Sequence, residues 1–177
     1  YPFEIMIKKA VHLFNSGYFE EGMALVFNTE DLDESYVSEF LIGIFDKTNI
    51  EEIIQLTREM NDSYWRNVTL KEISILLFQR GIFTTALELM NEISYVQMLN
   101  SALKKLLNQI ESNDKLIPLE LLKNLLQKSA PWVDFNLLIE IVELALKIND
   151  KEIITILSNS QDSINFKEKY FYMVGQM

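Results

Sequence analysis

The chain has 177 residues, of which 49% are hydrophobic and 24% charged, a composition typical of a folded protein rather than a disordered one. Sixteen basic and twenty-six acidic residues give a net charge of −10, which disfavours nucleic acid and anionic membranes as partners. The absence of cysteine excludes disulfide bonds and thiolate chemistry, and a single histidine, His12, excludes a multi-histidine metal site.

Glycine and proline are scarce, at five and three residues, which favours helices joined by short polar turns over a β fold. Apolar residues recur at the three- and four-residue spacing of helices, as in Leu99, Leu103, Leu106 and Ile110. The pattern predicts eleven helices, at residues 4–16, 19–28, 34–47, 50–60, 63–80, 83–92, 95–111, 116–128, 132–148, 151–159 and 164–175.

Several predicted helices carry start signals. Short side-chain oxygens can accept hydrogen bonds from first-turn amides, which predicts N-caps at Asp33, Asp62, Ser94 and Ser163. Pro131 suits a first helical turn, where its missing N–H costs nothing.

One segment of the chain recurs. Residues 16–25 are similar to residues 80–89, and their glycines, Gly17 and Gly81, are 64 residues apart, or two periods of 32. Further copies begin at Asn49 and Asn149, and a weaker one begins at Asn113. We therefore expect a single domain of helix–turn–helix units of about 31 to 36 residues. These units fall at residues 3–33, 34–65, 66–98, 99–131 and 132–162, followed by a capping helix at 163–177.

The turn sequences carry a family resemblance. Gly17-Tyr18-Phe19 with Gly22, and Gly81-Ile82-Phe83 with Ala86, combine a turn glycine, a following aromatic residue and a small residue where two helices approach. In these residues the chain resembles a degenerate tetratricopeptide-repeat array, or a close α-solenoid relative, whose unit is about 34 residues. Residues 3–93 carry the resemblance, and residues 94–177 carry it by period and helix pattern only. At the positions of the family's tryptophan, the chain has Met6, Val37 and Leu70. At the positions of the family's terminal proline, it has Glu34, Trp65 and Met98.

The resemblance implies an all-α fold, an α-α superhelix in which about five hairpins form a right-handed stack. Aligning the first helices by their turns gives an apolar strip of equivalent positions, Val11, Phe14, Ile42, Phe45, Ile75 and Phe78. In the resembled family these positions face the inside of the superhelix, where peptides bind. With Lys71 they are the candidate partner-binding residues. The alternative interpretation is that the strip is ordinary core.

Other candidate chemistry has simpler structural explanations. His12 has no catalytic partner evident from the sequence, and Glu20-Glu21 and Glu51-Glu52 suit helix starts. The acidic residues 30–34 lack the glycine and the closing glutamate of a calcium loop. Trp65 is either a binding anchor or a seal between units. No nucleotide-binding glycine loop or zinc motif occurs, so we expect no enzyme activity, cofactor or metal.

These observations favour a non-catalytic scaffold or adaptor that binds a partner protein or peptide through a concave apolar face. The acidic balance favours neutral or basic segments. We expect no membrane insertion and a cytoplasmic location, and the start at Tyr1 suggests a piece of a longer protein. The alternatives are a peptide-sensing regulatory domain of a larger protein, a closed helical bundle acting as an inhibitor or chaperone, and an enzyme built around His12.

Overall fold

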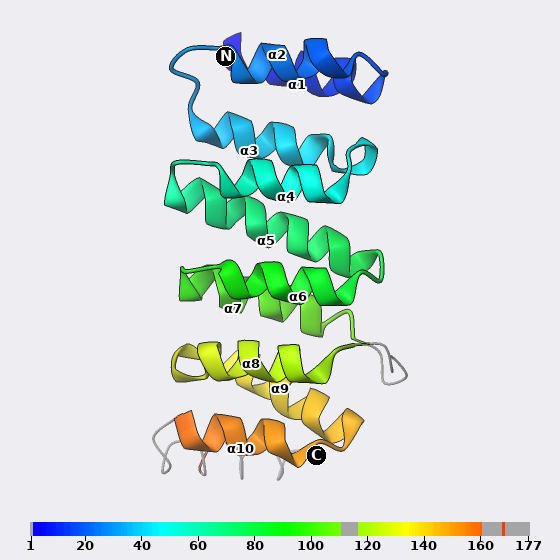
Figure 1. The fold of residues 1–177 in the computed structure, drawn as a ribbon. Helices are drawn as coiled ribbons and strands as arrows, with labels where there is room; N and C mark the ends of the chain where they lie inside the picture. The colour runs from blue at the N-terminus through cyan, green and yellow to red at the C-terminus, as the bar shows by residue number, and fades with distance from the viewer. Residues whose placement is uncertain (1, 111–116, 161–167, 169–177) are drawn as a thin grey trace. The chain divides into compact units, whose positions relative to one another are not determined.

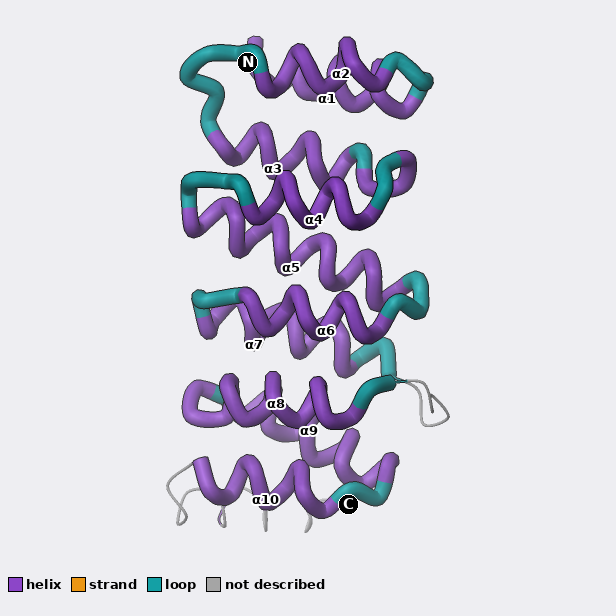
Figure 2. Tube along the Cα trace, viewed as in Figure 1, coloured by secondary structure: helices purple, strands orange, loops and turns teal. Residues whose placement is uncertain are grey.

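The computed structural model describes residues 2–110, 117–160 and 168, and these residues contain helices and no strands. Figures 1 and 2 show the helices joined in succession by turns and loops. The α-helices are α1 (Pro2–Asn15), α2 (Phe19–Phe27), α3 (Glu34–Gly43), α4 (Ile50–Arg58), α5 (Ser63–Gln79), α6 (Phe83–Glu92), α7 (Val96–Leu107), α8 (Leu119–Ser129), α9 (Phe135–Ile148) and α10 (Lys151–Ser160). Two short 3-10 helices are η1 (Phe45–Lys47) and η2 (Ala130–Trp132).

The chain divides into two compact units, an N-terminal unit, Tyr1–Ile73, and a C-terminal unit, Ser74–Met177. The boundary falls inside α5. In the N-terminal unit α1 packs on α2 and α3, and α3 packs on α4. In the C-terminal unit α8 packs on both α6 and α10, while α7 packs on α9. Each unit is thus built by burying the apolar face of one helix against more than one neighbour.

The all-α class is confirmed, and the first ten predicted helices have counterparts in the structure. The third is shorter than expected, because the α-helix ends at Gly43 and the chain tightens into η1. Helix α5 begins at Ser63, three residues before the unit boundary expected at residue 66. The predicted capping helix, with its N-cap Ser163, lies outside the described residues apart from Glu168.

Two of the predicted N-caps are confirmed. The Asp33 carboxylate accepts from the Ser35 N–H at 2.8 Å, and the Asp62 carboxylate accepts from the Tyr64 N–H at 2.8 Å. The prediction of Ser94 is wrong, because α7 begins at Val96 and its first hydrogen bond is accepted by the carbonyl of Tyr95.

Pro131 occupies a helix start of another kind than we expected. It lies in the first turn of η2 and not of α9. Helix α9 begins at Phe135 after its own N-cap, Asp134, whose carboxylate accepts from the Leu137 N–H at 2.8 Å. The η2 turn and the Asp134 cap therefore replace the single long helix predicted over residues 132–148.

Gly17 and Gly81 occupy matching turns, as predicted. Their φ angles are +96° and +78°, a region that disfavours residues with a Cβ atom. In both turns the glycine N–H donates to the carbonyl three residues earlier, and the next N–H donates to the carbonyl five residues earlier, at 3.0 Å in every case. This is the Schellman arrangement that ends a helix by satisfying its last carbonyls.

The turn at Asn149 repeats this geometry, and the turn at Asn49 does not. Asn149 has a φ of +54°, and the N–H of Asp150 donates to the carbonyl five residues earlier at 2.9 Å. Asn49 has a φ of −63° and instead caps α4 by accepting from the Glu51 N–H at 2.9 Å. The second copy of the predicted repeat therefore keeps the position of the turn but changes its backbone.

The predicted close helix contact at Gly22 is confirmed. A Cβ atom on Gly22 would lie 2.8 Å from the Ala10 carbonyl oxygen and 3.0 Å from the Phe14 Cβ, so α1 and α2 touch along their backbones. Ala86, at the matching position of α6, is fully buried. Both small residues lie five positions after a turn glycine, which fixes where the second helix meets the first.

Candidate functional site

The phenylalanines of the apolar strip are buried. Phe14, Phe45 and Phe78 are 6%, 2% and 3% exposed, which favours the interpretation of the strip as ordinary core. The cause for Phe14 is the neighbouring Phe40, whose ring meets it edge-on at a centroid distance of 6.1 Å. Phe45 is not in an α-helix at all, since it opens η1. These rings contribute to the core of their units.

The rest of the candidate set is more varied. Ile75 is buried, whereas Val11, Ile42 and Lys71 are half-buried. The Val11 side chain lies against the backbone at Gly43, where an added Cβ would meet its methyl carbon at 2.9 Å. The Lys71 ammonium lies 3.4 Å from the Glu72 carboxylate. No continuous exposed strip results from these seven side chains.

Two phenylalanines of the apolar strip each pack against a second phenylalanine ring that is more exposed to solvent. Phe14 packs on Phe19 at a centroid distance of 4.9 Å and an angle of 70°, and Phe78 packs on Phe83 at 4.7 Å and 60°. In each pair the rings are five residues apart across the glycine turn. Phe19 is 50% exposed and Phe83 half-buried, so the second ring is the one that solvent reaches.

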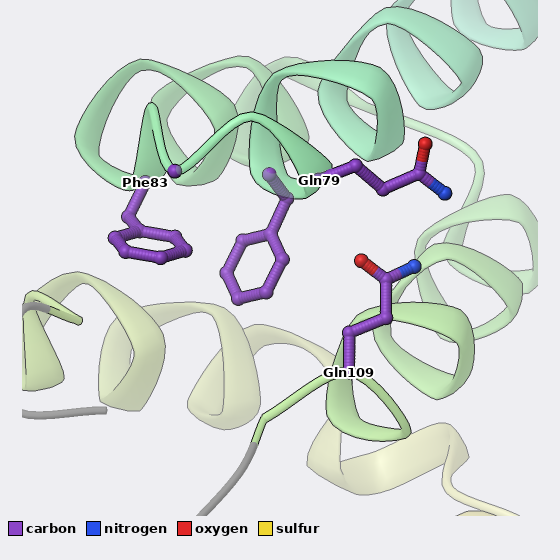
Figure 3. A pocket seen from close by; sticks show the side chains of 5 residues that line it. Gln79, Phe83 and Gln109 are labelled. Carbon is purple, nitrogen blue, oxygen red and sulfur yellow. The ribbon is translucent and has the colours of Figure 1, made fainter. Parts of the chain in front are cut away.

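In the C-terminal unit the ring pair borders a cavity that we call the glutamine hollow. It has a volume of about 490 Å³ and is lined by Phe78, Gln79, Gly81, Phe83 and Gln109. Gln79 ends α5, and Gln109 follows α7. Figure 3 shows their side chains extending from different elements toward one space, with the Phe83 ring on its other side. Among the residues that the structure describes, no charged side chain lines it.

In the N-terminal unit the equivalent ring pair borders a second cavity, the glutamate hollow. Its volume is about 430 Å³, and it is lined by Phe14, Phe19, Glu20, Met23, Lys47, Thr48, Asn49 and Glu52. The two glutamates lie in the first turns of α2 and α4, which confirms the predicted helix-start positions. The same aromatic pair therefore lies beside two carboxamides in one unit and beside two carboxylates, among other side chains, in the other.

A buried cation links two helices of the C-terminal unit. The Lys123 ammonium lies 2.6 Å from the Glu152 carboxylate and 3.0 Å from the Asp150 carboxylate. Hydrogen bonds to these acids raise the pKa of Lys123, and the same contact lowers the pKa of Asp150. The ammonium is fully paired with acids of its own chain, so we assign it a structural role.

Two further groups of this unit have shifted pKa values. The Lys128 ammonium donates to the carbonyls of Asn91 and Ile93, at 2.7 and 2.9 Å, at the end of α6. Burial lowers the pKa of Lys128. Burial also raises the pKa of Glu140, whose Oε2 atom has no hydrogen-bond partner among the described residues.

The other candidates from the sequence are separate from the hollows. His12 is exposed on α1, and Trp65 is half-buried, edge-on against Tyr64 at 5.1 Å. In the acidic stretch, Glu34 accepts from the N–H groups of Asn61 and Asp62 at 2.8 and 2.7 Å. Within residues 2–110, 117–160 and 168 no three acidic or histidine side chains come together as metal ligands, and no helix has the length and apolarity to cross a membrane.

Neither the aromatic pairs nor the hollows are predicted from the sequence. The repeated turn predicts Phe19 and Phe83 as its aromatic residues but does not assign them to a site. The repeat of Phe at positions three before and two after each glycine was the available signal. Comparison with protein-family models, curated proteins and solved structures found no match to this chain.

Proposed function

We propose that this chain is a non-catalytic protein-interaction domain, a scaffold or adaptor, that binds a peptide segment of a partner in the glutamine hollow. One observation carries the proposal: two carboxamides, Gln79 and Gln109, border a cavity that also has a wall of two phenylalanines packed edge to face. The recurrence of this turn supports the tetratricopeptide-like superhelix as the arrangement of the hairpins.

The chemistry of the lining matches a peptide backbone. A carboxamide has both an N–H donor and a carbonyl acceptor, the same groups that a main-chain amide presents. Gln79 and Gln109 can therefore pair with the main chain of an extended segment without selecting its charge. Phe83 offers an apolar surface for one side chain of that segment, as is usual in ligand sites with few polar groups.

In the proposed site, Phe78 of the apolar strip has a supporting role. Phe78 is 3% exposed and contacts the Phe83 ring, so it holds that ring in position. Binding energy then comes from the partly exposed ring and the two carboxamides, and Phe78 keeps them in place. The concave-face site proposed from Val11, Ile42, Lys71 and Ile75 remains a separate hypothesis.

A displayed library of random peptides, selected on the intact chain, tests this function. Synthetic copies of enriched peptides are measured by calorimetry on the wild type and on the double variant Gln79→Ala/Gln109→Ala. We expect binding about tenfold weaker in the variant, since each lost hydrogen bond contributes about 0.5–1.5 kcal/mol.

The matched control is Gln97→Ala/Gln127→Ala, which removes two exposed glutamines of the same unit that do not line the hollow. The control should bind as the wild type does, and circular dichroism should show both variants folded. If no peptide is enriched, or if enriched peptides bind the Gln79/Gln109 variant with wild-type affinity, the proposal is wrong.

A further inference from the structure

We propose that the glutamate hollow of the N-terminal unit is a second binding site, and that its occupant is an arginine-rich peptide segment with one apolar side chain. This site goes beyond the proposed function, because it belongs to the other unit and uses different residues. Three observations support this site: the exposure of the Phe19 ring, the residues that line the cavity, and the net charge of the N-terminal unit.

The apolar part of the site is Phe19 with its neighbours. Phe19 is 50% exposed although its ring is held edge-on against the buried Phe14. Met23, one turn further along α2, lines the same cavity of about 430 Å³. A held aromatic ring beside a flexible thioether offers apolar area to a medium-sized side chain, with little ordering cost for the ring.

The acidic part of the site lies on two helices. Glu20 is in the first turn of α2 and Glu52 in the first turn of α4, and both line the cavity. Among the described residues of the lining, Lys47 is the one basic side chain. A guanidinium can pair with a carboxylate through two parallel hydrogen bonds and can also stack on an aromatic ring. Arginine therefore satisfies both the glutamates and Phe19.

The net charge of the N-terminal unit also favours a basic peptide segment. Residues 1–73 contain fourteen acidic and six basic residues, a net charge of −8. Residues 74–177 contain twelve acidic and ten basic residues, a net charge of −2. The field that steers a charged partner is therefore concentrated on the unit that holds the glutamate hollow, and it attracts a basic segment.

The site is tested with three capped peptides, Arg-Arg-Leu-Arg-Arg, Arg-Arg-Ser-Arg-Arg and Glu-Glu-Leu-Glu-Glu, titrated into the intact chain by fluorescence anisotropy. We expect the leucine peptide with arginines to bind most tightly and the glutamate peptide not to bind. Binding should weaken as salt is raised, because exposed charges are screened beyond about 8 Å at physiological ionic strength.

Variants then separate the hollow from the general charge. Glu20→Gln/Glu52→Gln should bind the Arg-Arg-Leu-Arg-Arg peptide about fivefold or more weakly, given what an exposed ion pair contributes. The control Glu30→Gln/Glu39→Gln makes the same change in net charge at exposed acids outside the hollow and should change affinity by less than about twofold. Lys47→Gln should bind this peptide more tightly, a gain that unfolding cannot produce.

Phe19→Ala tests the apolar part. It should weaken the leucine peptide and leave the serine peptide unchanged. Equal losses in the two glutamate double variants, an unaffected leucine peptide in Phe19→Ala, or no binding by the wild type would each overturn the inference. The Gln79→Ala/Gln109→Ala variant should bind the basic peptides normally, so failure here is distinguishable from failure of the glutamine hollow.

Discussion

The Lys123 ammonium lies 2.6 Å from the Glu152 carboxylate and thereby links the middle of α8 to the first turn of α10. Asp150 approaches the same ammonium at 3.0 Å from the residue just before α10. One cation therefore joins two acids at a helix start, where carboxylates are also favoured by the helix dipole. Leaving these acids without their cation is the costly change.

We expect Lys123→Met to destabilise the C-terminal unit at neutral pH, and to do so less in acid. The Lys123 contact lowers the folded-state pKa of Asp150, so its stabilisation is present above the unfolded-state pKa of about 4. It is lost as the pH falls through the lower folded-state pKa. Urea unfolding at neutral pH and in acid measures this difference.

Lys147→Met, at an exposed lysine of α9, is the matched control and should change stability little at either pH. A pH dependence of Lys123→Met equal to that of the wild type would show that Asp150 gains nothing from Lys123.

Gly22→Ala should separate α1 from α2. The added Cβ would lie 2.8 Å from a backbone oxygen of Ala10, which cannot move without the helix. We expect a loss of about 1–3 kcal/mol in the free energy of unfolding. Thermal and urea unfolding are the measurements. Ala24→Ser, exposed on the same helix, should stay within about 0.5 kcal/mol of the wild type.

Gly81→Ala should cost about 1–2 kcal/mol through its backbone alone, because the position has a φ of +78° and no atom within 4 Å of an added Cβ. Gly81→Asn should cost less, since Asn149 adopts the same turn with a φ of +54°. Unfolding free energies of the two variants test this order. Equal costs would mean that asparagine has no advantage over alanine at this φ angle.

Phe45→Ala and Phe78→Ala should each lower the free energy of unfolding by about 3–5 kcal/mol, as expected of buried rings. Phe27→Ala, at a ring that is 44% exposed, should cost clearly less. Denaturant unfolding followed by circular dichroism measures all three. If the two buried-ring variants were as stable as the wild type, the rings would not contribute to the core as the structure shows.

The helices and their turns could be predicted because their signals are local. Apolar spacing placed the first ten helices, and Gly17 and Gly81 marked their turns without any knowledge of packing. Burial could not be predicted in the same way. Phe14 packs against Phe40 of α3, a ring contact that apolar spacing alone does not show. Asn49 looked equivalent to the glycines, but its cap geometry differs.

The two hollows could not be predicted from local sequence signals, because their lining residues are far apart in the sequence. Gln79 and Gln109 are 30 residues apart, and Glu20 and Glu52 are 32 residues apart. Each pair lines one cavity only because separate helices pack in a particular way. A period of about 32 residues could have suggested both pairs, since it brings equivalent turns into register, but it does not show which side chains stay exposed.

Helix α5 has a consequence for any attempt to divide the protein. The boundary between the two units lies between Ile73 and Ser74, in the interior of this helix. A helix carries hydrogen bonds from each N–H to the carbonyl four residues earlier, so four backbone bonds span that boundary. Severing the chain there would leave two frayed ends with unsatisfied amides and carbonyls. The compact units are therefore not separable modules, and dissection must keep α5 whole on one side.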